Sequence, residues 1–107
     1  MNFEVFLIDD AEKDLFEIFN YMFQNDSPDN ADHVYSEITK TILNLNQMPE
    51  RGHKPKEFDR IGVQDYLEIF FKPYRIIYQI KNREVYVHCV LDGGRDLEDL
   101  LQRRLLR

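Results

Sequence analysis

The sequence predicts an α+β fold in which helices lie on one face of a small, mostly antiparallel sheet. Three observations lead to this prediction: a strand-like run opens the chain, two segments of helical period follow, and three strand-like runs fill the second half. A final leucine-rich segment predicts a C-terminal helix, so the expected order is β-α-α-β-β-β-α. No repeat or linker divides residues 1–107, and we expect a single domain.

The N-terminal half predicts one strand and a helical hairpin. Residues 3–8, FEVFLI, form a short apolar run with aromatic and β-branched residues, which is typical of a strand. From Asp10 the apolar residues recur at helical spacing. They are Ala11, Leu15, Ile18, Phe19 and Met22. Ser27 and Pro28 then signal a second helix, because a hydroxyl caps the first turn and a proline needs no N–H donor there. Helical spacing continues to Asn46, so the two helices are expected to be antiparallel neighbours.

The second half predicts a loop, an antiparallel meander and a final helix. Residues 46–60 contain two prolines, a glycine and many charges, which are typical of a loop. Three runs rich in β-branched and aromatic residues follow at 66–71, 74–80 and 85–91, separated by connections of hairpin length. The tripeptide DGG then breaks the sheet. The leucines of residues 95–107 recur at helical spacing, with acids early and arginines late, as the helix dipole favours.

Charge and composition exclude several classes of protein. The net charge of −6 is uneven: residues 1–32 carry nine acids and one base, whereas the rest of the chain carries 11 acids and 13 bases. This balance disfavours general binding to nucleic acid, which needs a basic face, but it suits a basic protein partner. The single cysteine, Cys89, cannot form an intrachain disulfide, no segment resembles a signal peptide, and no apolar run is long enough to span a membrane. We therefore expect a soluble, cytoplasmic protein.

No motif for a metal or a cofactor stands out. The three histidines lack the spacing of metal ligands, and the sequence has no glycine-rich phosphate loop and no nucleophile motif. We therefore expect neither a metal nor a cofactor. Cys89 lies in the middle of a predicted strand and is interpreted as a buried structural residue.

Arginine and histidine residues of the second half are the candidate functional residues. Arg75 lies in mid-strand, where an arginine either pairs with a carboxylate such as Glu68 or binds an anion. Strand alternation places His88 on one face with Tyr86 and Val90, and we expect a hydrogen-bonded structural histidine, with an acid–base role as the alternative. The arginines of the tail are either a solvated helix end or a binding site.

The tract KPYRIIYQIKNREVYVHCVLDGGRDLEDLLQRRLL, with the upstream LNQMPERG, resembles the RelE/ParE superfamily of bacterial toxins from type II toxin–antitoxin systems. The similarity extends over nearly the whole chain, and its most specific part is YRIIYQI followed by VYVHCVLDGGRDL and the leucine–arginine tail. The resemblance implies an α+β fold in the order given above. It also implies one of two targets: RelE-type members cleave mRNA on the ribosome, whereas ParE-type members, the plasmid-stabilisation branch, poison DNA gyrase.

Only part of the RelE-type nuclease set is present. The resemblance implies lysines on the second strand, arginines on the third strand and after the fourth, and a C-terminal tyrosine. Arg75 and Arg95 match the arginine positions, but Tyr66 and Glu68 stand near the lysine positions, and a glutamate there would repel phosphate. Leu101 stands near the position of the tyrosine. If the chain were a nuclease, its catalytic residues would be Arg75, Arg95 and His88.

The resemblance and the charge together favour a ParE-like toxin that inhibits DNA gyrase by binding and not by catalysis. Its expected partners are gyrase and a cognate ParD-like antitoxin, which neutralises the toxin in a hetero-oligomer; specific DNA binding is not expected without the antitoxin. The residues expected to bind the target are Arg95, Arg103, Arg104 and Arg107. A RelE-like, ribosome-dependent mRNA endonuclease is the alternative, and a toxin-like fold without toxicity is the third hypothesis.

Overall fold

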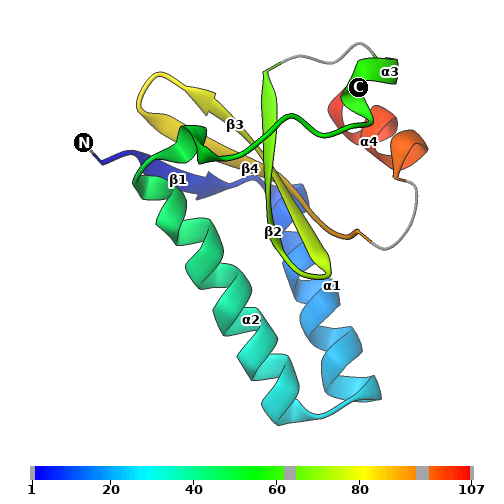
Figure 1. The fold of residues 1–107 in the computed structure, drawn as a ribbon. Helices are drawn as coiled ribbons and strands as arrows, with labels where there is room; N and C mark the ends of the chain where they lie inside the picture. Colours follow the sequence, from blue (N-terminus) through cyan, green and yellow to red (C-terminus); the bar gives the residue numbers. More distant parts are fainter. Residues whose placement is uncertain (1, 62–64, 94–96, 107) are drawn as a thin grey trace.

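The computed structural model describes residues 2–61, 65–93 and 97–106, and its elements follow the predicted order (Figure 1). The strands are β1 (Glu4–Leu7), β2 (Tyr66–Phe71), β3 (Tyr74–Lys81) and β4 (Glu84–Asp92). The α-helices are α1 (Asp9–Asn25), α2 (Pro28–Leu43), α3 (Phe58–Ile61) and α4 (Glu98–Leu105). Two short 3-10 helices, η1 (Asn44–Asn46) and η2 (Pro49–Arg51), follow α2. The predicted class and order are confirmed, and the predicted loop contains η2 and α3 as additional short elements.

The four strands form one sheet in the order β1-β4-β3-β2. β1 pairs with β4 in parallel, whereas β4, β3 and β2 are antiparallel neighbours, which confirms a mostly antiparallel sheet. A parallel pair cannot be joined by a tight turn, and here the helical hairpin, β2 and β3 all lie between β1 and β4 along the chain. β4 contains one bulge: Ile77 pairs with Cys89 and the next residue, Tyr78, pairs with Val87, so that His88 is the extra residue.

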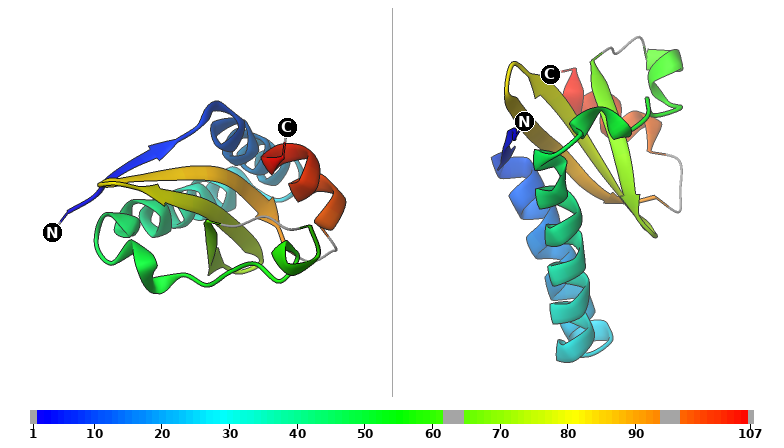
Figure 2. Two further views of the ribbon diagram at one scale, coloured as in Figure 1. Left: turned by 90° about the horizontal axis from the view of Figure 1, so that it is seen from above. Right: turned by 60° about the vertical axis from the view of Figure 1, so that its left-hand side comes forward.

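α1 and α2 form the predicted antiparallel hairpin, which projects well beyond the sheet (Figures 1 and 2). The start of α2 is as predicted, since the Ser27 hydroxyl accepts a hydrogen bond of 3.0 Å from the backbone N–H of Asn30 and Pro28 is the first helical residue. The α-helix ends at Leu43, earlier than the predicted end at Asn46, because the last turn tightens into the 3-10 geometry of η1.

Helices cover both faces of the sheet, and the expectation that they all lie on one face is wrong. The hairpin packs on one face, in a cluster that includes Leu15, Ile38 and Tyr78. A second cluster on the other face joins α3 and α4 to the sheet; it consists of Phe58, Ile77, Cys89, Leu97 and Leu101. The physical reason is that β3 is buried on both sides, so each face needs its own cover. The docking of α4 through leucines and the burial of Cys89 are as predicted.

Candidate functional site

Arg75 lies in the middle of β3, on the face that α3 and α4 cover, with only 5% of its surface exposed. Glu68 approaches it from β2, which runs antiparallel beside β3. The Arg75 Nε donates a hydrogen bond of 2.7 Å to Glu68 Oε1, and Nη2 donates one of 3.0 Å to Oε2. The first of the two interpretations of Arg75, an ion pair with Glu68, is therefore what the structure contains.

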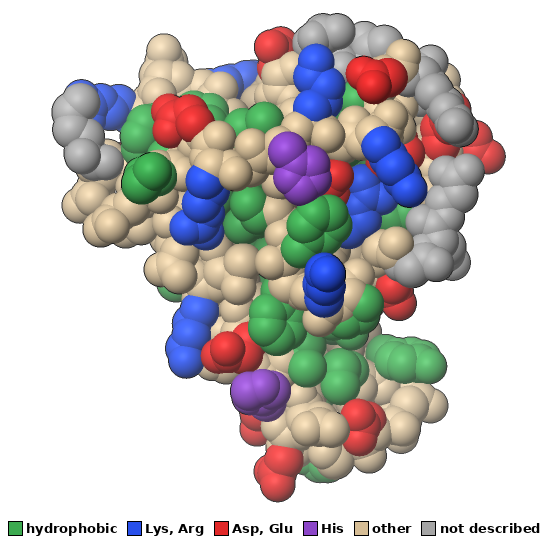
Figure 3. Space-filling model, in the orientation of Figure 1, with side chains coloured by type: hydrophobic (Ala, Val, Ile, Leu, Met, Phe, Trp, Pro, Cys, Tyr) green, Lys and Arg blue, Asp and Glu red, His purple; other side chains and the backbone are tan. Residues whose placement is uncertain are grey.

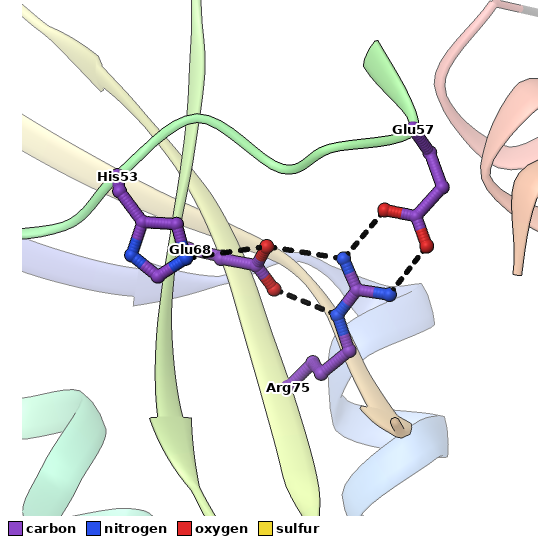
Figure 4. Close-up of polar contacts among 4 residues, drawn as sticks. All are labelled: His53, Glu57, Glu68 and Arg75. Atoms are coloured by element: carbon purple, nitrogen blue, oxygen red, sulfur yellow. Dashed lines mark hydrogen bonds and ion pairs between the residues drawn. The ribbon is translucent and has the colours of Figure 1, made fainter. Parts of the chain in front are cut away.

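A second carboxylate, Glu57, binds the other side of the same guanidinium (Figure 4). The Nη1 and Nη2 atoms of Arg75 donate hydrogen bonds of 2.6 Å and 2.7 Å to the two Glu57 oxygens. Glu57 reaches this place because the loop before it lies along β2: the backbone N–H and C=O of His53 bond to the C=O and N–H of Glu68 at 3.1 Å and 2.7 Å. The chain then turns into α3 through a bond from the Phe58 N–H to the Pro55 carbonyl.

The two carboxylates and one guanidinium form a buried cluster with an excess of negative charge, which we call the Arg75 cluster (Glu57, Glu68 and Arg75). Hydrogen bonding to Arg75 lowers the pKa of Glu57 below its ordinary value, against the opposing effect of burial. Hydrogen bonding to Glu57 likewise raises the pKa of Arg75. Because both edges of the guanidinium already face carboxylates, Arg75 presents no free fork to a phosphate in this arrangement.

A glycine next to the sheet makes room for the Arg75 side chain. A Cβ atom built on Gly93 would lie 2.6 Å from Arg75 Cγ and 2.7 Å from Cδ, which is closer than non-bonded carbons approach. The Gly93 N–H is fixed in place by a bond of 2.8 Å to the Pro73 carbonyl. Gly93, which belongs to the predicted break of the sheet, therefore also leaves the space that the arginine occupies.

His88 is the bulge residue of β4, and its ring packs edge to face on Tyr66 with 5.1 Å between centroids. Its Nε2 atom is buried without a hydrogen-bond partner among the residues that the structure describes. Burial, together with the charges of Lys81 and Arg104, lowers the pKa of His88 below 6.5. The expected shared face with Val90 is wrong, because the bulge turns Val90 toward the helical hairpin while His88 stays with Tyr66 on the other side.

The structure does not bring the nuclease candidates together. No hydrogen bond or ion pair joins Arg75 and His88 in the described part of the chain, although both lie on the α4 side of the sheet. Arg95 lies outside the described residues. Tyr66 and Glu68 stand near the lysine positions of the nucleases. Tyr66 packs against Phe58, and Glu68 belongs to the Arg75 cluster.

The tail arginines have different environments. Arg104 is largely covered, with 16% of its side chain exposed, and donates bonds of 3.2 Å and 2.9 Å to the two carboxylate oxygens of Asp14 on α1. It also donates a bond of 2.9 Å to the His88 carbonyl. Arg103 is exposed and makes no ion pair with any residue between 2 and 106 that the structure describes. Arg107, like Arg95, lies outside the described residues.

Sequence reasoning missed Glu57 and Asp14. For Asp14 a signal exists, since it lies three residues after Ala11 and four before Ile18, on the apolar stripe of α1, where a carboxylate needs a partner. For Glu57 we find no such signal, because it lies in a loop and its partner is 18 residues away.

A groove of about 890 Å³ lies between β1, α1 and α2, on the edge of the sheet opposite to β2. Apolar residues form most of it, and Phe16, Tyr35 and Leu43 are exposed in its walls. Its acidic residues are Asp9, Glu12 and Glu17, against one base, Lys13. The Oγ1 of Thr39, which also lines the groove, is buried without a hydrogen-bond partner among the described residues. These features suit a partner that is apolar on one side and basic on the other.

Two classes of site are not found within the described ranges. No group of three or more His, Cys, Asp or Glu side chains among these residues could hold a metal ion. None of the helices described is long and apolar enough to cross a membrane.

Comparison with known proteins adds a family and a set of folds. Residues 5–97 match the family model described as the ParE toxin of the type II toxin–antitoxin system, parDE. A structure of the chromosomal ParDE system of Pseudomonas aeruginosa is similar with a TM-score of 0.71 and 15% identity, over 82% of this chain and 92% of that one. The toxin–antitoxin complex RelBE2 of Mycobacterium tuberculosis is similar with a TM-score of 0.62 and 16% identity, over 89% and 95%. A mutant of the Escherichia coli toxin RelE in the free state has a TM-score of 0.66 and 15% identity, over 100% and 98%. No curated protein matches the sequence significantly.

Proposed function

Because the chain belongs to the ParE toxin family of type II toxin–antitoxin systems, we propose that it acts by binding and inhibiting DNA gyrase, in the cytoplasm, without cleaving RNA. The observation that carries this proposal is the Arg75 cluster. The arginine that would face the phosphate in a RelE-type nuclease donates four hydrogen bonds to Glu57 and Glu68. Releasing it would leave two buried carboxylates without their partner, at a cost of about 3–5 kcal/mol.

Charge supports the same proposal. A phosphodiester that approached the Arg75 cluster would meet a site with more carboxylates than cations, on a protein with a net charge of −6. Metal-free cleavage of RNA needs cations around the phosphorus and a group that can donate a proton to the leaving oxygen. Glu68, near a lysine position of the nucleases, supplies no cation. Leu101, near the position of their tyrosine, has no proton to donate.

A ribosome-dependent mRNA endonuclease is the second candidate, and one observation favours it. The lowered pKa of His88 keeps the imidazole neutral near pH 7, and its Nε2 has no hydrogen-bond partner within the described residues, so the ring could accept a proton. Arg95 would then have to supply the positive charge that Arg75 cannot.

The C-terminal tail is the proposed contact with gyrase. Arg103 is exposed on α4, and Arg95 and Arg107 flank the helix in the sequence. Arg104 belongs to the same proposed set, but its side chain bonds to Asp14 and to the His88 carbonyl. We infer that Arg104 acts indirectly: it holds α4 against α1 and so fixes the orientation of Arg103.

An antitoxin partner follows from the family, and we propose the groove between β1, α1 and α2 as its binding site. The groove has exposed aromatic side chains and acidic residues, and β1 is an edge strand of the sheet. A ParD-like antitoxin would place a segment here that is apolar toward the floor and basic toward the rim, forming a hetero-oligomer.

The gyrase proposal is tested with the purified protein in a DNA supercoiling assay. We expect inhibition of gyrase, and brief expression in bacteria should induce the SOS response and filamentation. Arrest of translation with newly cleaved mRNA would establish the nuclease candidate instead. Arg103→Glu should weaken inhibition, whereas Arg83→Glu, the same charge change on the exposed β3–β4 turn, should not.

The antitoxin proposal is tested by co-purification with the small protein encoded next to this gene. Phe16→Glu, which places a charge in the groove, should abolish the complex. Tyr21→Glu is the matched control, since Tyr21 is a similarly exposed aromatic residue of α1 that does not line the groove. If both variants lose the complex to the same extent, the antitoxin binds the hairpin at a place other than the groove.

A further inference from the structure

The edge of the sheet opposite to the groove has a surface of the opposite charge. Four exposed cations and two aromatic or heteroaromatic rings lie on η2, the loop that follows it, and β2 with its turn. We call this surface the basic face; its residues are Arg51, His53, Lys54, Lys56, Phe70 and Lys72. Figure 3, which looks onto this side of the molecule, shows Lys and Arg side chains gathered around a histidine in its upper half.

The basic face is held in a fixed shape by the Arg75 cluster beneath it. In the segment from His53 to Glu57, Pro55 and Glu57 are buried, whereas Lys54 and Lys56 on either side of Pro55 are exposed. Glu57 anchors one end of this segment through its two hydrogen bonds with Arg75. The bridge between His53 and Glu68 anchors the other end. Because the backbone is fixed, this segment does not have to be ordered when it binds a partner, and only the lysine side chains lose freedom.

An apolar side chain lies within the basic face. Phe70 is 45% exposed, and one side of its ring is covered by the imidazole of His53, with 5.3 Å between centroids. The His53 Nε2 lies 3.6 Å from Glu68 Oε2, which orients the imidazole (Figure 4). An exposed aromatic ring on a surface that also carries several exposed cations is suited to a partner that combines acidic and apolar side chains.

We propose that the basic face binds an acidic segment of a protein partner, with its carboxylates on Lys54, Lys56 and Lys72 and an apolar side chain on Phe70. A protein segment fits better than a nucleic acid, because the net charge of −6 opposes a dense polyanion more strongly than a short acidic peptide. This proposal does not depend on gyrase being the target of the toxin.

The basic face and the antitoxin groove lie at opposite edges of the sheet, β2 and β1. Two partners of opposite charge can therefore bind one toxin at different places. The basic face lies next to α3, and α3 contacts α4, so a segment bound on it would approach the tail that carries Arg103.

The test is fluorescence anisotropy with a labelled glutamate-rich peptide that carries regularly spaced leucines. We expect the full chain to bind it, and Lys54→Glu, Lys56→Glu and Lys72→Glu together to weaken binding by about tenfold or more. The control combines Lys40→Glu, Lys81→Glu and Arg83→Glu, which change the net charge equally from exposed positions outside the basic face. It should stay within about threefold of the unaltered protein.

Three outcomes would overturn the proposal. One is no binding of the acidic peptide, and another is an equal loss in both triple variants, which would reveal a general charge effect. The third is tighter binding of a polyuridine oligonucleotide than of the peptide, which would make this a nucleic-acid surface. A thermal melt verifies that both triple variants are folded, and Lys→Gln at the same three positions gives a milder second test. The supercoiling assay tests the proposed function separately. If the unaltered chain does not inhibit gyrase, the proposed function is wrong, but the result with the acidic peptide is unaffected.

Discussion

Arg104 of α4 bonds to Asp14 of α1, and the pair lies beside the part of β4 that extends beyond β1. β1 pairs with β4 only as far as Val87, and beyond it none of the described strands pairs with the His88 carbonyl or the Val90 N–H on that side. Arg104 donates a 2.9 Å bond to the first of these groups, and Asp14 accepts a 3.0 Å bond from the second. The two side chains also bond to each other. Together they bond the backbone groups of β4 that a neighbouring strand would otherwise bond.

Replacing Arg104 by Met should therefore destabilise the fold. The change leaves the Asp14 carboxylate and the His88 carbonyl short of a charged donor in a largely covered position, and we expect the free energy of unfolding to fall by about 1–3 kcal/mol. Urea denaturation measures this. Arg103→Met, one position earlier and exposed, should change stability by no more than about 0.5 kcal/mol. Similar effects of both substitutions would show that the Asp14 pair contributes nothing.

Replacing Arg75 by Met should cost more. The substitution leaves Glu57 and Glu68 buried without a cation, and we expect a loss of about 3–5 kcal/mol in urea denaturation. Adding Glu57→Gln and Glu68→Gln to the same chain should recover part of this loss, because the uncompensated charges are then removed. If the added changes bring no recovery, the cost comes from packing and not from charge.

Acid should destabilise the protein through Glu57. Its pKa in the folded state is below its ordinary value of 4.5, so the ionised carboxylate stabilises the fold above that pH, and the contribution is lost as the pH falls through the lower, folded value. Chemical denaturation at a series of pH values should show stability decreasing below about pH 4.5. Glu57→Gln should be less stable at neutral pH and should lack this part of the slope. An unchanged slope would assign the acid sensitivity to other carboxylates.

His88 should add a second pH dependence, at higher pH. Its pKa in the folded state is below 6.5, so the unfolded chain takes up the proton first and stability decreases as the pH falls below that value. His88→Phe keeps a ring against Tyr66 but cannot be protonated. Relative to the unaltered protein, this variant should gain stability between about pH 7 and pH 5.5, by at most about 1.4 kcal/mol per pH unit. His33→Phe, at an exposed position of α2, is the control.

The sequence by itself determined the order of the elements and most of their limits. The apolar period of α1, the Ser27–Pro28 start of α2 and the β-branched runs of β2, β3 and β4 are local signals, and each element forms where its own residues favour it. The pairing of Arg75 with Glu68 was also among the expectations, since a mid-strand arginine needs a carboxylate on a neighbouring strand. The docking of the C-terminal leucines followed from their spacing.

Only the tertiary structure decided which distant residues meet. Glu57 joins Arg75 from a loop, Asp14 joins Arg104 across the whole chain, and the bulge at His88 reverses the alternation that a regular strand would have. None of these is encoded in a local period, because hydrophobic spacing reports which side of an element is buried and not what it is buried against. The placement of α4 on the second face of the sheet has the same cause. Periodicity showed that α4 has an apolar side, but the free face of β3 that receives it exists only once the sheet has assembled.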